Sequence, residues 1–408
     1  MSILTLPRAT SGAVTMTRRA ALLGLAGAMT FGRSRVALAT PATEQRLVVV
    51  LLRGALDGLS AVQPYGDPAL AGLRGDLAMP EPGKEGGLLD LGGFFGLHPS
   101  LSGMANLYKS GDLAIAHAIA GHYRDRSHFA AQDFLESGAD HRLSSGWLNR
   151  VAALLPARPG KAPGVETALA VGNTVGLMLR GSAPVGAWLP QSFGKPDAGL
   201  YQALARLHAT DPVTGIAVSE GLKERGFTAG VLNGSEPQQD RFSFPSLAAA
   251  VGKLLASADG PRIAAMEMFG WDTHNAQLAR LPGVLTQLDR GITALRENTG
   301  ASWSRTAVLV LTEFGRTAAI NGTKGTDHGT GTVAFLAGGA VAGGRVITDW
   351  PGLGTGKLFE NRDLMPTADL RSFIKGVLAA HYRFDGARLA GIFPDSADAR
   401  PTSGLLRT

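Results

Sequence analysis

The sequence TAVLVLT-EFGRT at residues 306–317, followed by TDHG at residues 326–329, decides the fold. An unbroken β-branched and apolar run such as 306–312 is typical of a strand buried on both faces, as in a parallel sheet. The run stops at Glu313, and a glycine-bearing loop leads to Asp327 and His328. A carboxylate at the tip of a buried strand, followed by an Asp-His pair on a loop, indicates a metal or catalytic site.

Strand and helix patterns alternate along the rest of the chain. This alternation predicts an α/β fold, a mostly parallel central sheet with helices on both faces. Residues 61–96 are rich in Pro, Gly and Leu and are expected to form a long loop, and residues 156–240 an insertion or cap. Strands are expected at 46–52, 113–119, 168–171, 263–269, 306–312 and 332–336, and helices at 99–108, 129–137, 147–155, 200–207, 246–256, 284–297 and 367–380.

Composition excludes several classes of protein. The chain has 408 residues, 45% hydrophobic and 18% charged, which fits a globular enzyme-like chain. The formal charge is +6, but residues 1–39 hold five arginines and no acid. Without them 34 basic residues face 33 acidic ones, a net of +1, so no nucleic-acid partner is expected. There is no cysteine, which rules out disulfides and thiolate metal sites.

The first 39 residues are typical of an export signal. Arg18-Arg19 precedes an apolar run at 20–32, and Ala37-Leu-Ala39 supplies the small-x-small cleavage pattern. Paired arginines before a mildly hydrophobic, glycine-rich core indicate a twin-arginine signal. We therefore expect a periplasmic protein of residues 40–408, handled by the twin-arginine translocation machinery. No other segment is long and apolar enough for a stable membrane span.

Polar residues follow four predicted strands. They are Asp57, the stretch 122–128, Asp272 with His274, and Glu313. The carboxyl ends of parallel strands lie at one edge of a sheet, so these side chains are expected to meet there. Their carboxylate and imidazole groups suit a divalent metal such as zinc, manganese or calcium.

Each candidate has a purely structural alternative. Asp57 fits a turn that bonds its own backbone, and Asp272 fits the cap of a surface turn. Glu313 fits an ion pair with Arg316, which otherwise would grip a substrate oxyanion. Asp327 and His328 alone are a weak signal that strengthens beside Glu313. The remaining histidines are expected to be structural: His98, His117, His141, His208 and His381.

Ser127 opens the predicted helix 129–137 beside basic residues. Its simplest role is a helix N-cap. Next to Arg124, Arg126 and His128, however, an N-cap hydroxyl also suits anion binding. In an ester hydrolase Ser127 would be the nucleophile, and His128 is alternatively a metal ligand.

These motifs together resemble a family of exported bacterial proteins, domain of unknown function 1501. The resemblance rests on the twin-arginine signal and on LRGALDGL at 52–59, YRDRSHF at 123–129, GWDTH at 270–274, TEFGRT at 312–317 and TDHG at 326–329. That family is similar to a branch of the alkaline phosphatase and sulfatase superfamily.

The resemblance implies roles by order along the chain. Asp57 takes the place of the first metal ligand and Ser127 that of the nucleophile. Asp272 and His274 match the later Asp/His pair, and His328 the last histidine. The chain departs from the superfamily in its Asp-x-His spacing, in having Glu313 where an Asp-His dipeptide is usual, and in the residues around Ser127.

Three functions follow as hypotheses. The first is a metal-dependent hydrolase of phosphate or sulfate esters acting on a small anionic substrate, with Arg124 or Arg316 on its non-bridging oxygens. The second is a catalytically silent periplasmic binding or assembly protein on the same fold. The third, a metal-dependent phosphomutase, fits an exported protein less well.

Overall fold

The computed structural model describes residues 44–157, 167–172, 174–190 and 242–407, with residues 203, 206–208, 218 and 221. The chain divides into units of residues 1–43 and 44–408, and the described residues belong to the second. The expected signal at 1–39 and most of the expected helix at 200–207 lie outside these residues.

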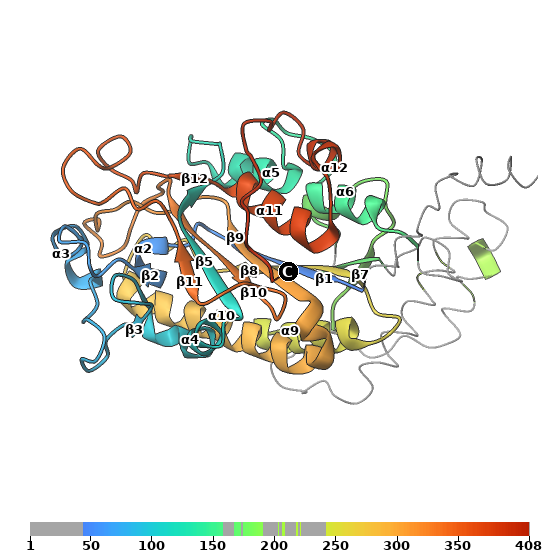
Figure 1. Ribbon diagram of the computed structural model, residues 1–408, viewed down its shortest axis with the longest axis horizontal. Helices are drawn as coiled ribbons and strands as arrows, with labels where there is room; N and C mark the ends of the chain where they lie inside the picture. The colour runs from blue at the N-terminus through green and yellow to red at the C-terminus, as the bar shows by residue number, and fades with distance from the viewer. Residues whose placement is uncertain are drawn as a thin grey trace, which may run out of the picture. The chain divides into compact units, whose positions relative to one another are not determined.

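A central sheet of nine strands organises the described part of the chain (Figure 1). Its order is β11-β5-β10-β9-β1-β8-β6-β7, and β12 pairs with β5. Only β10 runs antiparallel to its neighbours within these pairings, so the prediction of a mostly parallel sheet is confirmed. The strands are β1 (Arg46–Arg53), β5 (Leu113–Ala120), β6 (Ala168–Val171), β7 (Gly186–Trp188), β8 (Ile263–Phe269), β9 (Thr306–Thr312), β10 (Thr332–Ala337), β11 (Arg345–Ile347) and β12 (Ala368–Asp369).

Helices cover both faces of the sheet (Figure 1). Alternate residues of β1 enter two separate cores, because successive strand side chains point to opposite faces. Leu47 and Val49 join the core formed with the first group of helices, and Val48 and Val50 join the other. The first group is α6 (Trp147–Leu154), α11 (Leu370–Tyr382) and α12 (Gly386–Ile392), and the second is α4 (Ser102–Lys109), α9 (Phe244–Ala256) and α10 (Gln277–Thr299).

One more helix, α5 (His128–Ser137), begins directly beside the candidate site. Gly138 ends α5 in the left-handed conformation with φ 68°, as expected for a glycine at this position. The closing helix α11 begins at Leu370 with Asp369 as its N-cap, three residues later than the expected start at residue 367. The side chain of Asp369 accepts from the amide of Arg371, and residues 368–369 pair with β5 instead.

Two predicted loops contain regular structure. Within 61–96 lie a small sheet of β2 (Val62–Gln63), β3 (Leu89–Asp90) and β4 (Gly96–Leu97), and the helix α3 (Leu70–Arg74). Within the expected insertion, β6 and β7 extend the central sheet beyond β8. That part of 156–240 therefore belongs to the core architecture, and most of the rest lies outside the described residues.

The carboxyl ends of β1, β5, β8 and β9 lie at one edge of the sheet because these strands run in the same direction. The antiparallel strand β10 starts at that same edge, so the loop from β9 to β10, residues 313–331, also lies there. The fold thus places 54–57, 121–128, 270–274 and 313–331 side by side.

Candidate metal centre

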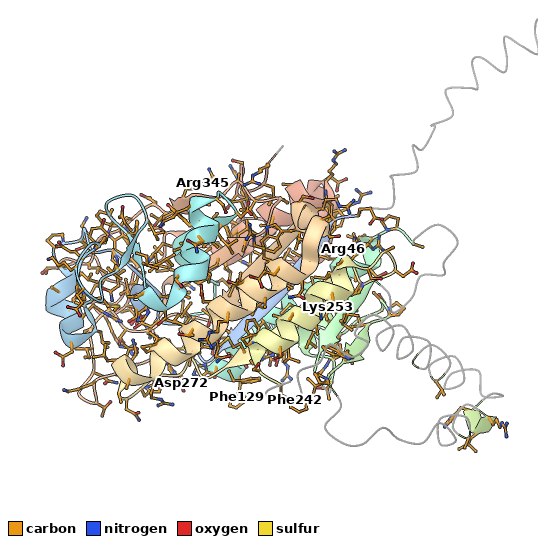
Figure 2. The ribbon with its side chains drawn as sticks, turned by 90° about the horizontal axis from the view of Figure 1, so that it is seen from below. Arg46, Phe129, Phe242, Lys253, Asp272 and Arg345 are labelled. Atoms are coloured by element: carbon orange, nitrogen blue, oxygen red, sulfur yellow. The ribbon has the colours of Figure 1, made fainter. Side chains whose placement is uncertain are left out.

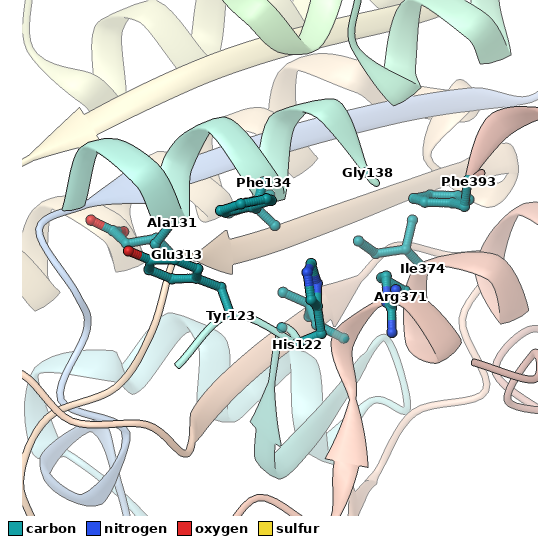
Figure 3. A pocket seen from close by; sticks show the side chains of 12 residues that line it. His122, Tyr123, Ala131, Phe134, Gly138, Glu313, Arg371, Ile374 and Phe393 are labelled. Carbon is teal, nitrogen blue, oxygen red and sulfur yellow. The ribbon is translucent and has the colours of Figure 1, made fainter. Parts of the chain in front are cut away.

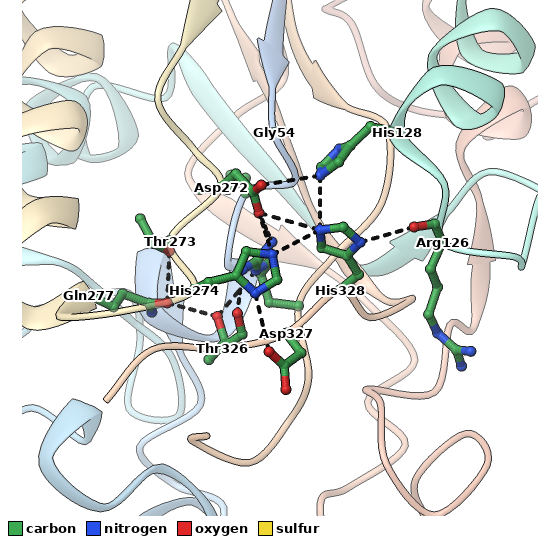
Figure 4. Close-up of polar contacts among 12 residues, drawn as sticks. Gly54, Arg126, His128, Asp272, Thr273, His274, Gln277, Thr326, Asp327 and His328 are labelled. Carbon is green, nitrogen blue, oxygen red and sulfur yellow. Dashed lines mark hydrogen bonds and ion pairs between the residues drawn. The ribbon is translucent and has the colours of Figure 1, made fainter. Parts of the chain in front are cut away.

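Four side chains from three loops converge at this edge (Figure 4). His128 is the first residue of α5, which follows β5. Asp272 and His274 follow β8, and His328 lies between β9 and β10. His128, Asp272 and His328 each offer one ligand atom within 4.8 Å of the others.

His274 lies directly beside these three residues. Its Nε2 is 3.0 Å from His328 Nε2 and 2.9 Å from Asp272 Oδ1. His128 Nε2 is also 3.0 Å from His328 Nε2. The Nε2 atoms of three imidazoles therefore crowd around one carboxylate.

The other ring nitrogen of each histidine faces an oxygen atom. His128 Nδ1 is 2.7 Å from Glu313 Oε1, and His274 Nδ1 is 3.2 Å from Asp327 Oδ1. His328 Nδ1 is 3.0 Å from the backbone carbonyl of Arg126. Carboxylate and carbonyl oxygens only accept hydrogen bonds, so Nδ1 carries the proton in all three rings. Each Nε2 then presents a lone pair inward, the arrangement in which proteins hold metal-ligating histidines.

A positive charge has to sit among these lone pairs, since they cannot face one another at 3.0 Å without one. The hydrogen bond to Glu313 raises the pKa of His128 above its ordinary value, so a proton there is one source of charge. Burial, and then the charge of His128, lowers the pKa of His328, which favours the neutral form of that ring. A metal ion is the other source, and it would replace the proton.

Asp272 remains ionised at this centre. Burial alone would raise its pKa, but the hydrogen bond and charge of Arg316 lower it below its ordinary value. Arg316 Nη1 lies 2.5 Å from Asp272 Oδ1. The Asp272 side chain is 43% exposed, and Figure 2 shows it at the surface of the molecule. The centre is therefore open to solvent on one side.

The donor set fits a divalent metal. Imidazole nitrogens with one carboxylate oxygen suit zinc, and also manganese, whereas calcium takes oxygen ligands. The four residues that would hold the ion are His128, His274, His328 and Asp272.

Glu313 and Asp327, both expected to be ligands, lie behind the histidines. Glu313 Oε1 accepts from His128 Nδ1 and, at 2.9 Å each, from Gln132 Nε2 and the Gly54 amide. Burial would raise the pKa of Glu313, but several hydrogen bonds lower it, and the one from His128 has the largest effect among them. Asp327 is half exposed and accepts from His274 and Asn321. The two carboxylates orient the rings and do not point at the centre.

Asp57 is not brought to the centre. Its carboxylate is 1% exposed and accepts from Arg74, Ser60 and Gln277. Burial would raise its pKa, but the charge of Arg74 leads the interactions that lower it. Asp57 also caps α2 (Gly58–Ala61). A buried guanidinium already neutralises this carboxylate, so the structure does not place Asp57 beside the histidines that were expected to share a metal with it.

The expected anion-binding arginines make internal bonds instead. Arg316 is buried and pairs with Asp272 and Thr326, so the expected alternative of a pair with Glu313 is not found. Arg124 donates to the carbonyls of Gly121 and Tyr123.

Ser127 is exposed at the N-cap of α5. Its side chain makes no capping hydrogen bond, so the expected capping role is not seen. The adjacent residue in the chain is the candidate ligand His128.

Sequence reasoning missed the groups that hold the histidines in place. Gln132 donates to Glu313 and lies one helical turn after His128, a spacing that places both on one face of α5. That spacing was the available signal. Arg53, which donates to Gln132 Oε1 at 2.8 Å, and the carbonyl of Arg126 had no comparable signal.

Behind Glu313 lies a mainly apolar pocket (Figure 3). Its walls come from α5, α11, the segment after β5 and the end of α12, and include His122, Tyr123, Phe134, Arg371 and Phe393. Burial lowers the pKa of His122. Glu313 is the residue that this pocket shares with the histidine cluster.

Comparison with known proteins gives one family and several structures. The model of a family described as "Protein of unknown function (DUF1501)" matches residues 123–393. No functionally curated protein matches the chain. None of the described helices is long and apolar enough to cross a membrane.

Three solved structures are similar at low identity. The C-terminal periplasmic domain of EcEptC from Escherichia coli, in complex with Zn, is 10% identical over 72% of this chain and 73% of its own, with a TM-score of 0.33. Ps i-CgsB in complex with k-i-k-neocarrahexaose is 9% identical over 88% and 77%, with a TM-score of 0.44. Alkaline phosphatase from the Antarctic bacterium TAB5 is 10% identical over 74% and 94%, with a TM-score of 0.35.

Proposed function

This chain belongs to the DUF1501 family, and we propose that it is an exported, metal-dependent hydrolase of phosphate or sulfate esters. One observation carries the proposal: three Nε2 atoms and the Asp272 carboxylate converge, with every Nδ1 held by an oxygen. Structural metal sites are usually closed, whereas reactive ones keep an open side. The exposure of Asp272 and His274, 43% and 42%, supports a reactive site.

The side chains divide into ligands, supports and a nucleophile. A bound divalent ion supplies positive charge that lowers the pKa of a hydroxyl and stabilises charge developing on an ester oxygen. His128, His274, His328 and Asp272 hold that position. Ser127 is our candidate nucleophile because it is exposed and stands beside His128 at the start of α5. The free amides of that helix end face incoming anions favourably.

The test is a screen of aryl phosphates and aryl sulfates, beside elemental analysis of the protein purified from the periplasm. We expect about one divalent metal per chain and hydrolysis of one ester class. Ser127→Ala should abolish turnover and leave the metal content unchanged, whereas His128→Ala should lose both. Ser304→Ala, at an exposed serine of the segment before β9, is the matched control and should retain both. A folded, metal-free and inactive wild-type protein would refute the proposal.

A second candidate is a metal-holding binding or assembly protein without catalysis. Asp57, which the resemblance places as the first metal ligand, forms a buried ion pair with Arg74. Among the described residues, Ser127 makes no hydrogen bond to a base that could activate it. This candidate predicts full metal content with no turnover of any ester. The metal analysis and the ester screen together distinguish the two.

We further propose that residues 1–39 are a twin-arginine signal and that residues 40–408 form one periplasmic domain of the alkaline phosphatase and sulfatase superfamily. The positions of Ser127 after β5, Asp272 after β8 and His328 between β9 and β10 support this placement. Replacing Arg18 and Arg19 by lysine should block export. Immunoblots of periplasmic and cytoplasmic fractions measure this, and unchanged export would contradict the proposed route.

A further inference from the structure

We infer that Asp363 is a positioning residue that holds the rings of His128 and His328 in place, an inference that rests on the proposed metal centre. Asp363 lies in the segment after β11, and its side chain is 0% exposed. A buried carboxylate is costly unless it is paired and hydrogen-bonded. Its partners therefore show what it stabilises.

One oxygen of Asp363 joins two loops of the centre. Asp363 Oδ2 accepts from Arg126 Nε at 2.9 Å and forms an ion pair with Arg126 Nη2 at 2.8 Å. The same oxygen accepts from Thr330 Oγ1 at 2.8 Å. Arg126 comes two residues before His128, and Thr330 comes two residues after His328. A single carboxylate thus fixes the segments that carry both rings.

The backbone of Arg126 adds a direct link to a ring. Its carbonyl is the acceptor for His328 Nδ1, as Figure 4 shows. Arg126 has φ 58°, a left-handed conformation that is unfavourable for a residue with a side chain. Such a conformation persists when its surroundings hold it. The hydrogen bond and the ion pair with buried Asp363 hold Arg126 in this conformation and so fix the orientation of its carbonyl.

The neighbouring backbone supports the same role. Arg362 Nη2 donates to the carbonyl of His328 at 2.7 Å, and the Gly331 amide donates to the carbonyl of Leu364 at 3.1 Å. Residues 362–364 therefore run along the loop that carries His328. A change at Asp363 is transmitted to the centre through these contacts.

Glu360 offers a matched control on the same arginine. Its Oε2 lies 2.5 Å from Arg126 Nη2, but its side chain is 56% exposed. Solvent screens such a pair, and neither Thr330 nor a histidine is among the partners seen for it in the described structure. Asp363→Asn and Glu360→Gln each remove one negative charge near Arg126, so a general charge effect would appear in both.

The experiment compares the full chain with both variants in two measurements. The first is Zn²⁺ affinity by competition with a chromophoric chelator, together with the absorption spectrum of the Co²⁺-loaded protein. We expect Asp363→Asn to weaken binding about 10- to 100-fold, the usual effect of losing an outer hydrogen-bond partner, and to change the Co²⁺ spectrum. Glu360→Gln should leave the affinity within about twofold and the spectrum unchanged.

The second measurement uses no metal. Ring ¹⁵N shifts of His328 in the metal-free protein report which nitrogen carries the proton. We expect Asp363→Asn to reduce the Nδ1–H form of His328 and Glu360→Gln to preserve it. If wild-type protein binds no metal, the proposed function fails, but these shifts still decide the role of Asp363.

Thr330→Val provides a milder change in case Asp363→Asn does not fold, since it removes one bond to Asp363 and keeps the ion pair. It should weaken Zn²⁺ binding several-fold, in the same direction. A folded Asp363→Asn with wild-type affinity and wild-type ring shifts would overturn the inference. Equal losses in Asp363→Asn and Glu360→Gln would also overturn it, because charge alone would then explain them.

Discussion

Replacing Glu313 by glutamine should weaken metal binding without dismantling the site. The side chain is 1% exposed, and its Oε1 is 2.7 Å from His128 Nδ1. Glutamine keeps the size and can still accept from His128, Gln132 and the Gly54 amide, but it lacks the charge. A hydrogen bond to a charged group contributes about 1.5–3 kcal/mol and a neutral one about 0.5–1.5 kcal/mol. The difference, about 1–1.5 kcal/mol, corresponds to roughly a tenfold rise in the Kd of the metal.

The same change should alter the pH dependence of binding. Metal binding displaces the proton from His128, so affinity rises with pH through the pKa of that ring. Glu313 raises this pKa in the wild type, so the rise extends above pH 6.5, the ordinary histidine value. In Glu313→Gln the rise should end at lower pH. The raised pKa of His128 stabilises the metal-free wild-type fold below pH 6.5, and this contribution is lost as pH climbs through that pKa. Metal-free Glu313→Gln should therefore be less stable than the metal-free wild type below pH 6.5, and the difference should shrink at higher pH.

Competition titrations with a chelator between pH 5.5 and 8.5 measure both effects. Glu267→Gln is the matched control because Glu267 pairs with Arg53, which keeps its second partner Glu136. We expect wild-type affinity and pH dependence in that variant. A folded Glu313→Gln protein with wild-type affinity at every pH would refute the supporting role of Glu313.

Three further predictions concern stability and ligation. Arg74→Met should lower the free energy of unfolding by about 3–5 kcal/mol, because it leaves the buried carboxylate of Asp57 without its ion-pair partner. Urea titration measures this loss, and elemental analysis should show an unchanged metal content. A loss of metal would show that Asp57 does act on the centre. Burial lowers the pKa of His117 and of His381 to about 4. The free energy of unfolding should therefore fall as pH drops from 6.5 through 4, by up to about 3 kcal/mol for each ring. Urea titrations at several pH values test this, and a free energy of unfolding that does not change with pH would contradict it. Removing the metal with a chelator should lower Tm, since free ion at 100 times Kd adds about 2.7 kcal/mol, and the shift should vanish in Asp272→Asn.

The sheet was predictable because its strands are simple in sequence. Residues 306–312 are buried at every position, and the run at 46–52 pairs in parallel with them on one side and with the run at 263–269 on the other. Continuous apolar strands of this kind leave little choice of architecture. The order of polar residues after strand ends therefore also placed His128, Asp272, His274 and His328 at one edge.

The division between ligands and supports was not predictable. Glu313 and His128 both follow strands, and only the packing of α5 decides that the carboxylate lies behind the ring. Asp57 is paired with Arg74, which lies 17 residues further along the chain in a segment with no strong pattern. Asp363 likewise meets Arg126 across 237 residues. Pairings of this kind depend on tertiary contacts that local spacing does not encode.

The rings of His128 and His328 meet although 200 residues separate them along the chain. An unfolded polypeptide therefore has no pre-assembled chelate, and ion capture has to wait until the strands have docked. An ion bound there would cross-link the three loops that carry the ligands, and its binding free energy would stabilise only the folded state. The fraction of chains that carry the ion would then report how far the protein has matured. In a cell compartment that supplies the ion only after folding, the protein would be folded before any ion is bound.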